Sequence, residues 1–126
     1  MLAYSTIGTN DMDRATAFYD ALFESVGAKQ IFKRPDGGFV AYGVQPGQPM
    51  FGIARPYDGG EAAPGNGNMV AIAASGPDDV KALYDKAIAL GATCAGEAGP
   101  RLGGMAHCGY VRDLDGNKLN FFHMGG

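Results

Sequence analysis

Two histidines are the side chains of this sequence best suited to acid–base chemistry near neutral pH. They are His107 and His123, and the unperturbed pKa of an imidazole lies close to neutrality. His107 stands beside Cys108 and three residues before Tyr110, so a histidine and a phenol are candidate catalytic groups here. No Asp, Glu or Ser stands at a spacing that completes a nucleophilic triad with either histidine.

The motif RDLDGNK, residues 112–118, has only part of the spacing of a calcium-binding loop. With Asp113 as the first ligand, Asp115 fits the next position, but the required glycine falls on Lys118 and the closing glutamate on Met124. The motif therefore predicts a tight turn in which its Gly or Asn takes a positive φ.

A repeated phrase indicates that the chain is built from two copies of one module. AFYDALFESVGA at 17–28 returns as ALYDKAIALGA at 82–92, and Tyr19 and Tyr84 lie 65 positions apart (84 − 19). In both phrases the apolar residues recur at i, i+3, i+4 and i+7, which predicts one buried stripe on each of two helices.

The flanks of the two helices also correspond. A short β-like run precedes and follows each helix, and the segments 38–53 and 108–122 each read as two apolar runs joined by a Pro-Gly or Asp-Gly turn, which is a hairpin signal. The sequence predicts an α+β fold of two tandem βαβββ modules. They would form a cupped mixed sheet around a cavity, with the helices outside.

We expect residues 1–126 to form a single domain in which the two modules share a core. Residues 1–55 would be module 1, the polar and turn-rich segment 56–67 the connector, and residues 68–126 module 2.

The segments YSTIGTNDMDRATAFYDAL near the start and GYVRDLDGNKLNFF near the end resemble the vicinal oxygen chelate superfamily, which includes glyoxalase I, bleomycin-resistance proteins and extradiol dioxygenases. The resemblance runs over almost the whole chain, and RDLDGNKL, residues 112–119, is its most specific element. It implies paired βαβββ modules, often in a dimer, with the active cavity inside the cupped sheet.

The resemblance also implies where a divalent metal would bind, because metal-dependent members take His, Glu or Gln ligands from the first and last strands of each module. The matching positions here are Tyr4, Phe51, Met69 and Asn120. Zinc and the other first-row divalent metals prefer imidazole, thiolate or carboxylate ligands, and these four side chains supply none of these groups. We therefore predict no metal and no other cofactor.

The same strands would line a pocket for an organic ligand. Alternation along each strand predicts that the following residues face the cavity: Tyr4, Thr6, Phe51, Ile53, Met69, Ala71, Asn120 and Phe122. The alternative is that Phe51 and Met69 simply fill a closed core. Alternation turns His123 toward the helix in a structural role, whereas His107 would lie near the cavity mouth.

Composition excludes two classes of partner. The net charge is −3 and the basic residues form no cluster, which argues against nucleic acid. The apolar runs are far shorter than the roughly 18 to 20 residues that span a bilayer, and the N-terminus lacks a basic region before an apolar run. We expect a soluble cytoplasmic protein with no membrane partner, whose Cys94 and Cys108 are reduced packing residues.

The favoured function is a glyoxalase/bleomycin-resistance-like protein that binds a small organic ligand in its cavity without a metal. The alternative is a glyoxalase-like lyase or related enzyme, either using His107 and Tyr110 or depending on a metal through ligands that the sequence does not reveal. Burial of one open sheet face per module also favours a homodimer.

Overall fold

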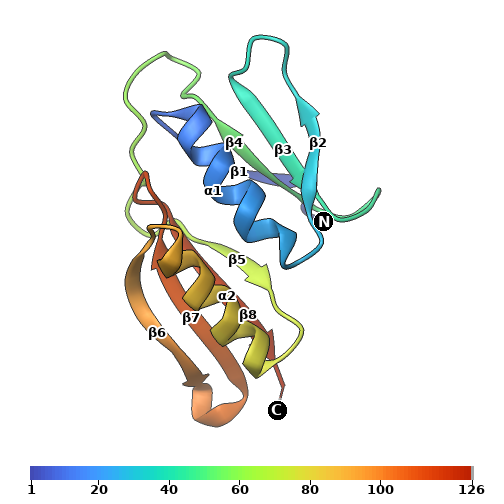
Figure 1. Ribbon diagram of the computed structural model, residues 1–126, viewed down its shortest axis with the longest axis vertical. Helices are drawn as coiled ribbons and strands as arrows, with labels where there is room; N and C mark the ends of the chain where they lie inside the picture. Colours follow the sequence, from blue (N-terminus) through green and yellow to red (C-terminus); the bar gives the residue numbers. More distant parts are fainter. Residues whose placement is uncertain (126) are drawn as a thin grey trace. The chain divides into compact units, whose positions relative to one another are not determined.

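The chain divides into two compact units that repeat one arrangement of strands and helix (Figure 1). The computed structural model describes residues 1–125, and the division falls between Pro64 and Gly65. We call the part up to Pro64 unit 1 and the part from Gly65 onward unit 2. Each unit contains one long helix and one four-stranded sheet.

Unit 1 has the element order βαβββ. Its elements are β1 (Tyr4–Gly8), α1 (Met12–Glu24), β2 (Lys29–Lys33), β3 (Phe39–Gly43) and β4 (Met50–Ala54). The strands lie in the order β1-β4-β3-β2, with β1 parallel to β4 and the other pairs antiparallel.

Unit 2 repeats this topology. Its elements are β5 (Val70–Ala73), α2 (Pro77–Ala89), β6 (Thr93–Arg101), the short 3₁₀ helix η1 (Leu102–Gly104), β7 (Ala106–Arg112) and β8 (Lys118–Met124). The strand order is β5-β8-β7-β6, and β5 is parallel to β8. The predicted α+β fold of tandem βαβββ modules is confirmed, with two mixed sheets that remain open.

Local sequence explains where each helix begins and ends. The carboxylate of Asp11 accepts a hydrogen bond from the backbone N–H of Arg14 at 3.0 Å and so caps the N-terminus of α1. α2 begins at Pro77, whose missing N–H costs nothing in the first turn. Beyond the helix ends, Gly27 and Gly91 take φ values of 74° and 110°, which only glycine adopts at little cost.

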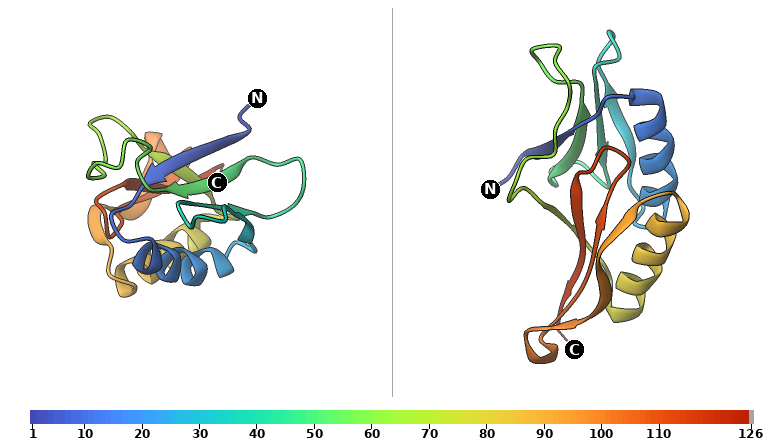
Figure 2. Two further views of the ribbon diagram at one scale, coloured as in Figure 1. Left: turned by 90° about the horizontal axis from the view of Figure 1, so that it is seen from above. Right: turned by 90° about the vertical axis from the view of Figure 1, so that its left-hand side faces the viewer.

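Each helix lies along one face of the sheet of its own unit (Figure 2). In unit 1 the contact is aromatic: the ring of Tyr19 lies 5.0 Å from that of Phe51, and the ring of Phe23 lies 5.2 Å from that of Tyr42. Aromatic pairs at these separations add to the stabilisation from burial alone. None of the helices within residues 1–125 is long and apolar enough to cross a membrane.

Candidate ligand-binding site

Three aromatic side chains gather on the face of the unit 1 sheet that α1 leaves uncovered, which we call the open face. The ring of Phe39 lies 6.1 Å from that of Tyr4, at an interplanar angle of 72°, and 6.1 Å from that of Phe32. Tyr4 is 54% exposed and Phe32 is 52% exposed. Monomeric proteins seldom expose large apolar groups side by side, so this cluster is a candidate binding surface.

Two features of the backbone bring these rings together. The register of β2 against β3 shifts between Gln30 and Phe32, so β2 bulges before Phe32. Gly52 lies beneath the ring of Phe39: a Cβ atom added there would stand 2.8 Å from the ring and 3.1 Å from Cγ2 of Thr6. The ring thus occupies the space that any larger residue at Gly52 would fill.

An open pocket of about 850 Å³ adjoins the open face at the end of β1. Thr6 belongs to both, because it touches the space around Phe39 and also lines the pocket. Two arginines, Arg34 and Arg55, line the same pocket together with Asp36. Its volume is within the usual range for small-molecule sites.

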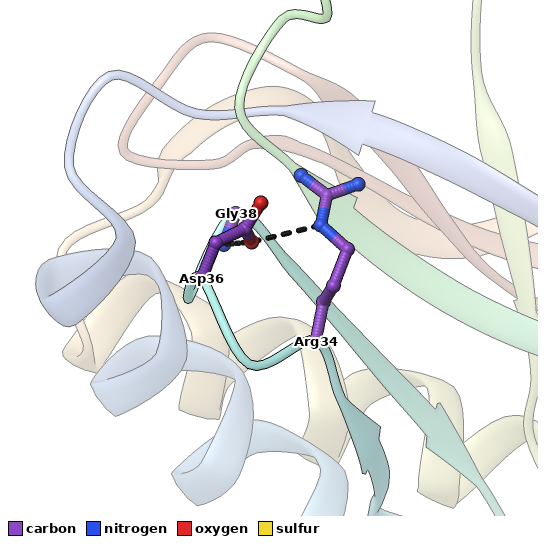
Figure 3. Close-up of polar contacts among 3 residues, drawn as sticks. All are labelled: Arg34, Asp36 and Gly38. Carbon is purple, nitrogen blue, oxygen red and sulfur yellow. Dashed lines mark hydrogen bonds and ion pairs between the residues drawn. The ribbon is translucent and has the colours of Figure 1, made fainter.

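Asp36 holds the side chain of Arg34 in a defined direction (Figure 3). Its Oδ1 accepts hydrogen bonds from Nε of Arg34 and from the backbone N–H of Gly38, both at 2.8 Å. These two bonds, in that order, hold the pKa of the Asp36 carboxyl below its usual value, and the charges of Arg34 and Arg55 add to the effect. Both partners are exposed, so the ion pair orients Arg34 more than it stabilises the fold.

The segment after β4 forms another wall beside Arg55. The side chain of Asn10 binds this segment at Ala62, accepting a hydrogen bond from its N–H at 2.7 Å and donating one to its carbonyl at 3.3 Å. A smaller pocket of about 330 Å³, lined by Asn10 and Arg55 among others, lies there. The connector is therefore attached to the start of α1 and helps to enclose the site.

The prediction that the side chains of Phe51 and Ile53 face the ligand cavity is wrong, because both point toward α1. Phe51 is 8% exposed, and its ring contacts those of Tyr19 and Phe23 on α1. Ile53 is fully buried and lies on the same face, since β4 alternates without interruption against β1. The residues of β4 on the open face are Met50, Gly52 and Ala54.

A one-residue slip explains this error. The sequence analysis placed Phe51 and Asn120 at equivalent positions of the two modules, an offset of 69 residues (120 − 51). The pairing of the parallel strands instead matches Thr6–Gly52 with Ala71–Asn120. The true offset is 68 (120 − 52). A shift of one residue in a strand moves every side chain to the other face of the sheet.

In unit 2, Asn120 and Phe122 lie on the face that α2 leaves uncovered. A Cβ atom added at Gly109 would stand 3.2 Å from Tyr84 of α2, so Gly109 and its partner Phe121 face the helix, and alternation turns Asn120 away from it. Asn120 is 5% exposed, and its Oδ1 has no hydrogen-bond partner among the described residues. Met69 is exposed and stands just before β5 begins.

Tyr110 shares this face with Asn120, its partner across β7 and β8. Hydrogen bonding with Cys108, followed by desolvation, raises the pKa of the Tyr110 phenol. Arg101 and Lys118 lie 5.6 Å and 5.1 Å from the centre of its ring. The raised pKa keeps the Tyr110 phenol protonated at neutral pH, so it is suited to donating a hydrogen bond rather than to removing a proton.

The two histidines face α2 instead. His107 and His123 are partners across β7 and β8, and His107 is two residues from the helix-facing Gly109. Nδ1 of His123 lies 3.3 Å from the carbonyl oxygen of Ala74. Since β7 runs without irregularity against β8, His107 and Tyr110 lie on opposite faces of the sheet, and the geometry does not bring the two candidate catalytic groups together.

The positions expected to hold a divalent metal do not fit one. With the corrected offset, the last-strand positions are Asn120 in unit 2 and Gly52 in unit 1, and a glycine offers no side-chain ligand. Tyr4 and Met69 at the other two positions supply a phenol and a thioether. Within residues 1–125, no three His, Cys, Asp or Glu side chains come close enough to hold a metal ion.

Sequence reasoning missed the aromatic residues Phe32 and Phe39 and the two arginines of the pocket. Arg34 and Arg55 are each the first residue after a strand of unit 1, and this shared position was a signal that could have been found. The β-bulge that turns Phe32 to the open face leaves no comparable trace in the sequence.

The model of the Glyoxalase/Bleomycin resistance protein/Dioxygenase superfamily matches residues 2–121. A glyoxalase/bleomycin resistance protein from Albidiferax ferrireducens T118 is 31% identical, with a TM-score of 0.86 over 98% of both chains. No curated protein matches the sequence.

Two more distant structures share the fold. Glyoxalase I from Zea mays is 24% identical with a TM-score of 0.75, and the match covers 99% of this chain and 45% of that one. TioX from Micromonospora sp. ML1 is 19% identical with a TM-score of 0.71 over 98% of both chains. On the match over nearly its whole length, this chain belongs to the Glyoxalase/Bleomycin resistance protein/Dioxygenase superfamily.

Proposed function

We propose that this protein binds a small organic molecule on the open face of unit 1 and that it does so without a metal ion. The observation that carries the proposal is the cluster of Tyr4, Phe32 and Phe39, whose rings contact one another while two of them remain half exposed. An apolar or aromatic ligand that covered these rings would be stabilised by about 25 cal/mol for each Å² of apolar surface removed from water.

The surroundings of the cluster suit a ligand with both apolar and polar parts. The hydroxyl of Thr6 and the adjoining pocket supply polar groups at one edge of the aromatic surface. Within unit 2, considered by itself, the side-chain Oδ1 of Asn120 is buried without a hydrogen-bond partner among the described residues, and a donor on a ligand bound there would remove that cost. Tyr4 and Thr6 are predicted to contact the ligand on this face of unit 1. Met69, Asn120 and Phe122 stay predicted ligand contacts within unit 2, whereas Phe51 and Ile53 face α1.

A lyase reaction through His107 and Tyr110 gains no support from the geometry, because the two side chains lie on opposite faces of one sheet. A metal-dependent reaction at the superfamily's usual position would need a ligand where Gly52 stands. Binding is therefore the simpler function for the residues present.

Nuclear magnetic resonance titration with benzamide, a neutral aromatic probe, tests the proposal. We expect amide shifts in β1 and β4, and weaker binding in Tyr4→Ala and Phe32→Ala. Ile88→Ala removes a 37% exposed apolar side chain from α2 and serves as the matched control. Shifts confined to other segments, or equal losses in all three variants, would contradict binding at the open face.

Metal content is measured separately by elemental analysis of the purified protein. We expect less than stoichiometric zinc, nickel, iron and manganese, and benzamide binding that chelator treatment leaves unchanged. A stoichiometric transition metal that disappears together with benzamide binding would defeat the metal-free part of the proposal.

The proposal includes a homodimer, because each unit leaves one sheet face without a helix. Sedimentation equilibrium should give about twice the chain mass of 13.1 kDa. A single species at the chain mass over the micromolar range would rule the dimer out.

A further inference from the structure

We infer that Arg34 and Arg55 form a binding site for an oxyanion, the carboxylate or phosphate group of a small ligand whose apolar part covers Tyr4 and Phe39. This inference rests on the proposed function and gives it a chemical class of ligand, an organic acid or a phosphate ester. It is carried by the position of the two arginines at one pocket, by the direction of the Arg34 side chain and by the charge of both.

Backbone hydrogen bonds fix the two arginines on either side of the start of β3. The N–H of Arg34 donates to the carbonyl of Phe39, and the N–H of Arg55 donates to the carbonyl of Gly38, both at 2.9 Å. Their backbones are thus two strand spacings apart, roughly 10 Å. Long side chains from two such positions can reach one anion between them.

The direction of Arg34 suits a bidentate contact. Its Nε donates a hydrogen bond to Asp36 at 2.8 Å, and Figure 3 shows both terminal nitrogens outside this hydrogen bond. The terminal nitrogens of a guanidinium match the two oxygens of a carboxylate or phosphate group in parallel hydrogen bonds. Asp36 therefore positions the group without using the nitrogens that would bind the ligand.

Gly38 leaves the space that this direction of Arg34 requires. A Cβ atom added at Gly38 would stand 2.5 Å from Nη2 of Arg34. The φ of Gly38 is not in the left-handed region, so the backbone itself does not call for glycine here. The small residue thus serves the placement of the guanidinium.

Arg55 supplies the second positive charge. Its guanidinium has no hydrogen-bond partner in the part of the chain that the structure describes, although its charge reaches Asp36. The pocket therefore contains two cations and one anion, a local excess of positive charge in a chain whose net charge is −3. Such a site attracts an anion that the chain as a whole would repel.

The apolar surface and the charged pocket are continuous through Thr6. The methyl group of Thr6 lies beside Phe39 above Gly52, and the same residue lines the pocket with Arg34. A ligand whose ring lies on the Tyr4–Phe39 surface therefore extends its charged group toward the two arginines. Neither half of the arrangement would select this ligand by itself.

Binding of benzoate, benzamide and phenyl phosphate, measured by the same titration, tests the inference. Benzoate and benzamide have the same shape and differ in charge. We expect benzoate to bind about tenfold more tightly than benzamide, because hydrogen bonds to charged groups are stronger than neutral ones. Amide shifts should appear in residues 34–38 and 54–57 with the anionic probes.

The comparison of the two anions identifies the acid group. Tighter binding of phenyl phosphate would identify the ligand as a phosphate ester, and tighter binding of benzoate would identify it as a carboxylic acid.

Single substitutions distinguish a specific contribution of the two arginines to benzoate affinity from a general effect of net charge. Arg34→Gln and Arg55→Gln should each bring benzoate affinity close to that of benzamide while leaving benzamide affinity unchanged. Arg34→Lys should give an intermediate value, because it keeps the charge and loses the paired nitrogens. Lys33→Gln is the control: it removes the same charge one residue away, from a side chain on the α1 side of β2.

Two results would overturn the inference. One is equal affinity for benzoate and benzamide in the unaltered protein, which refutes the oxyanion site and leaves binding at the open face intact. The other is an equal loss of benzoate affinity in Lys33→Gln and Arg34→Gln, which would assign the preference to general charge. Failure of every probe, benzamide included, would refute the proposed function as well.

Discussion

The ring of Phe39 lies directly over Gly52, in the space that a side chain at position 52 would occupy. Because Gly52 is the counterpart of Asn120 in unit 2, this contact replaces a potential ligand position of the superfamily with an aromatic surface. Position 52 therefore lacks a metal-binding side chain and lies instead beneath the aromatic cluster of the open face.

Substitution Gly52→Ala should disturb that surface. The new Cβ atom would stand 2.8 Å from the Phe39 ring, so the ring must move or the strand must shift. We expect a loss of stability of about 1–3 kcal/mol, as for other overpacked sites, together with weaker benzamide binding. Urea unfolding and the titration measure the two effects. Unchanged affinity with unchanged stability would show that Phe39 does not cover Gly52 in solution.

The two faces of the unit 1 sheet should respond differently to truncation. Phe51→Ala removes a ring buried against α1 and should cost about 3–5 kcal/mol of unfolding free energy. Tyr4→Ala removes a half-exposed ring and should cost less than about 1 kcal/mol, although it weakens benzamide binding. Chemical denaturation of both variants checks this contrast. The reverse order would mean that Phe51, and not Tyr4, faces the ligand.

Tyr42 should make stability depend on pH in the alkaline range. Burial, and then the hydrogen bond that its hydroxyl donates to Asp20 at 2.7 Å, raise the pKa of the Tyr42 phenol above its ordinary value of 10.0. The folded state therefore favours the protonated phenol. This stabilisation is fully present below pH 10 and falls as the pH rises above it, because the unfolded chain then releases the proton.

The variant Tyr42→Phe isolates this contribution. Near pH 8 it should lose about 1 kcal/mol through the missing hydrogen bond. Between pH 9 and 11 its unfolding free energy should decline less steeply than that of the unaltered protein. Parallel curves for the two proteins over that range would show that Tyr42 is not the group responsible.

Gly38→Ala should displace the guanidinium of Arg34 without unfolding the protein. The methyl group would meet Nη2, the end of a flexible side chain, which can move at small cost. We expect benzoate affinity to fall several-fold while benzamide affinity stays constant, since only the charged contact depends on this direction. Gly99→Ala, whose new Cβ atom would make only an ordinary contact at 3.5 Å, is the matched control. An equal change of benzoate affinity in the two variants would show that Gly38 has no specific role in placing the Arg34 guanidinium.

Much of the fold follows from local patterns that the sequence contains. The apolar stripe of Phe18, Tyr19 and Leu22 forms the buried face of α1, and Val80, Leu83 and Ala87 form that of α2. Helical periodicity and glycine stop signals act over a few residues, so a single sequence is enough to predict them. The duplication of the pattern then indicated the tandem modules, and the resemblance of segments such as RDLDGNKL, residues 112–119, indicated the superfamily.

The face of each strand residue was decided only by the tertiary structure. Phe51 and Gly52 are neighbours in sequence, and both fit an apolar strand, yet one packs on α1 and the other lies under Phe39. Which one lies on the open face depends on the register of β4 against β1. This register is a long-range property, and an offset between repeats that is wrong by one residue predicts the opposite face.

The two arginines of the pocket likewise come together only in the tertiary structure. From the sequence alone, Arg34 and Arg55 are separate surface cations 21 positions apart (55 − 34). They line one pocket because β2 and β4 pair with opposite edges of β3. The sequence determined the elements and the kind of fold through short-range periodicity. The site arises from strand pairing between distant segments, which only the folded chain brings together.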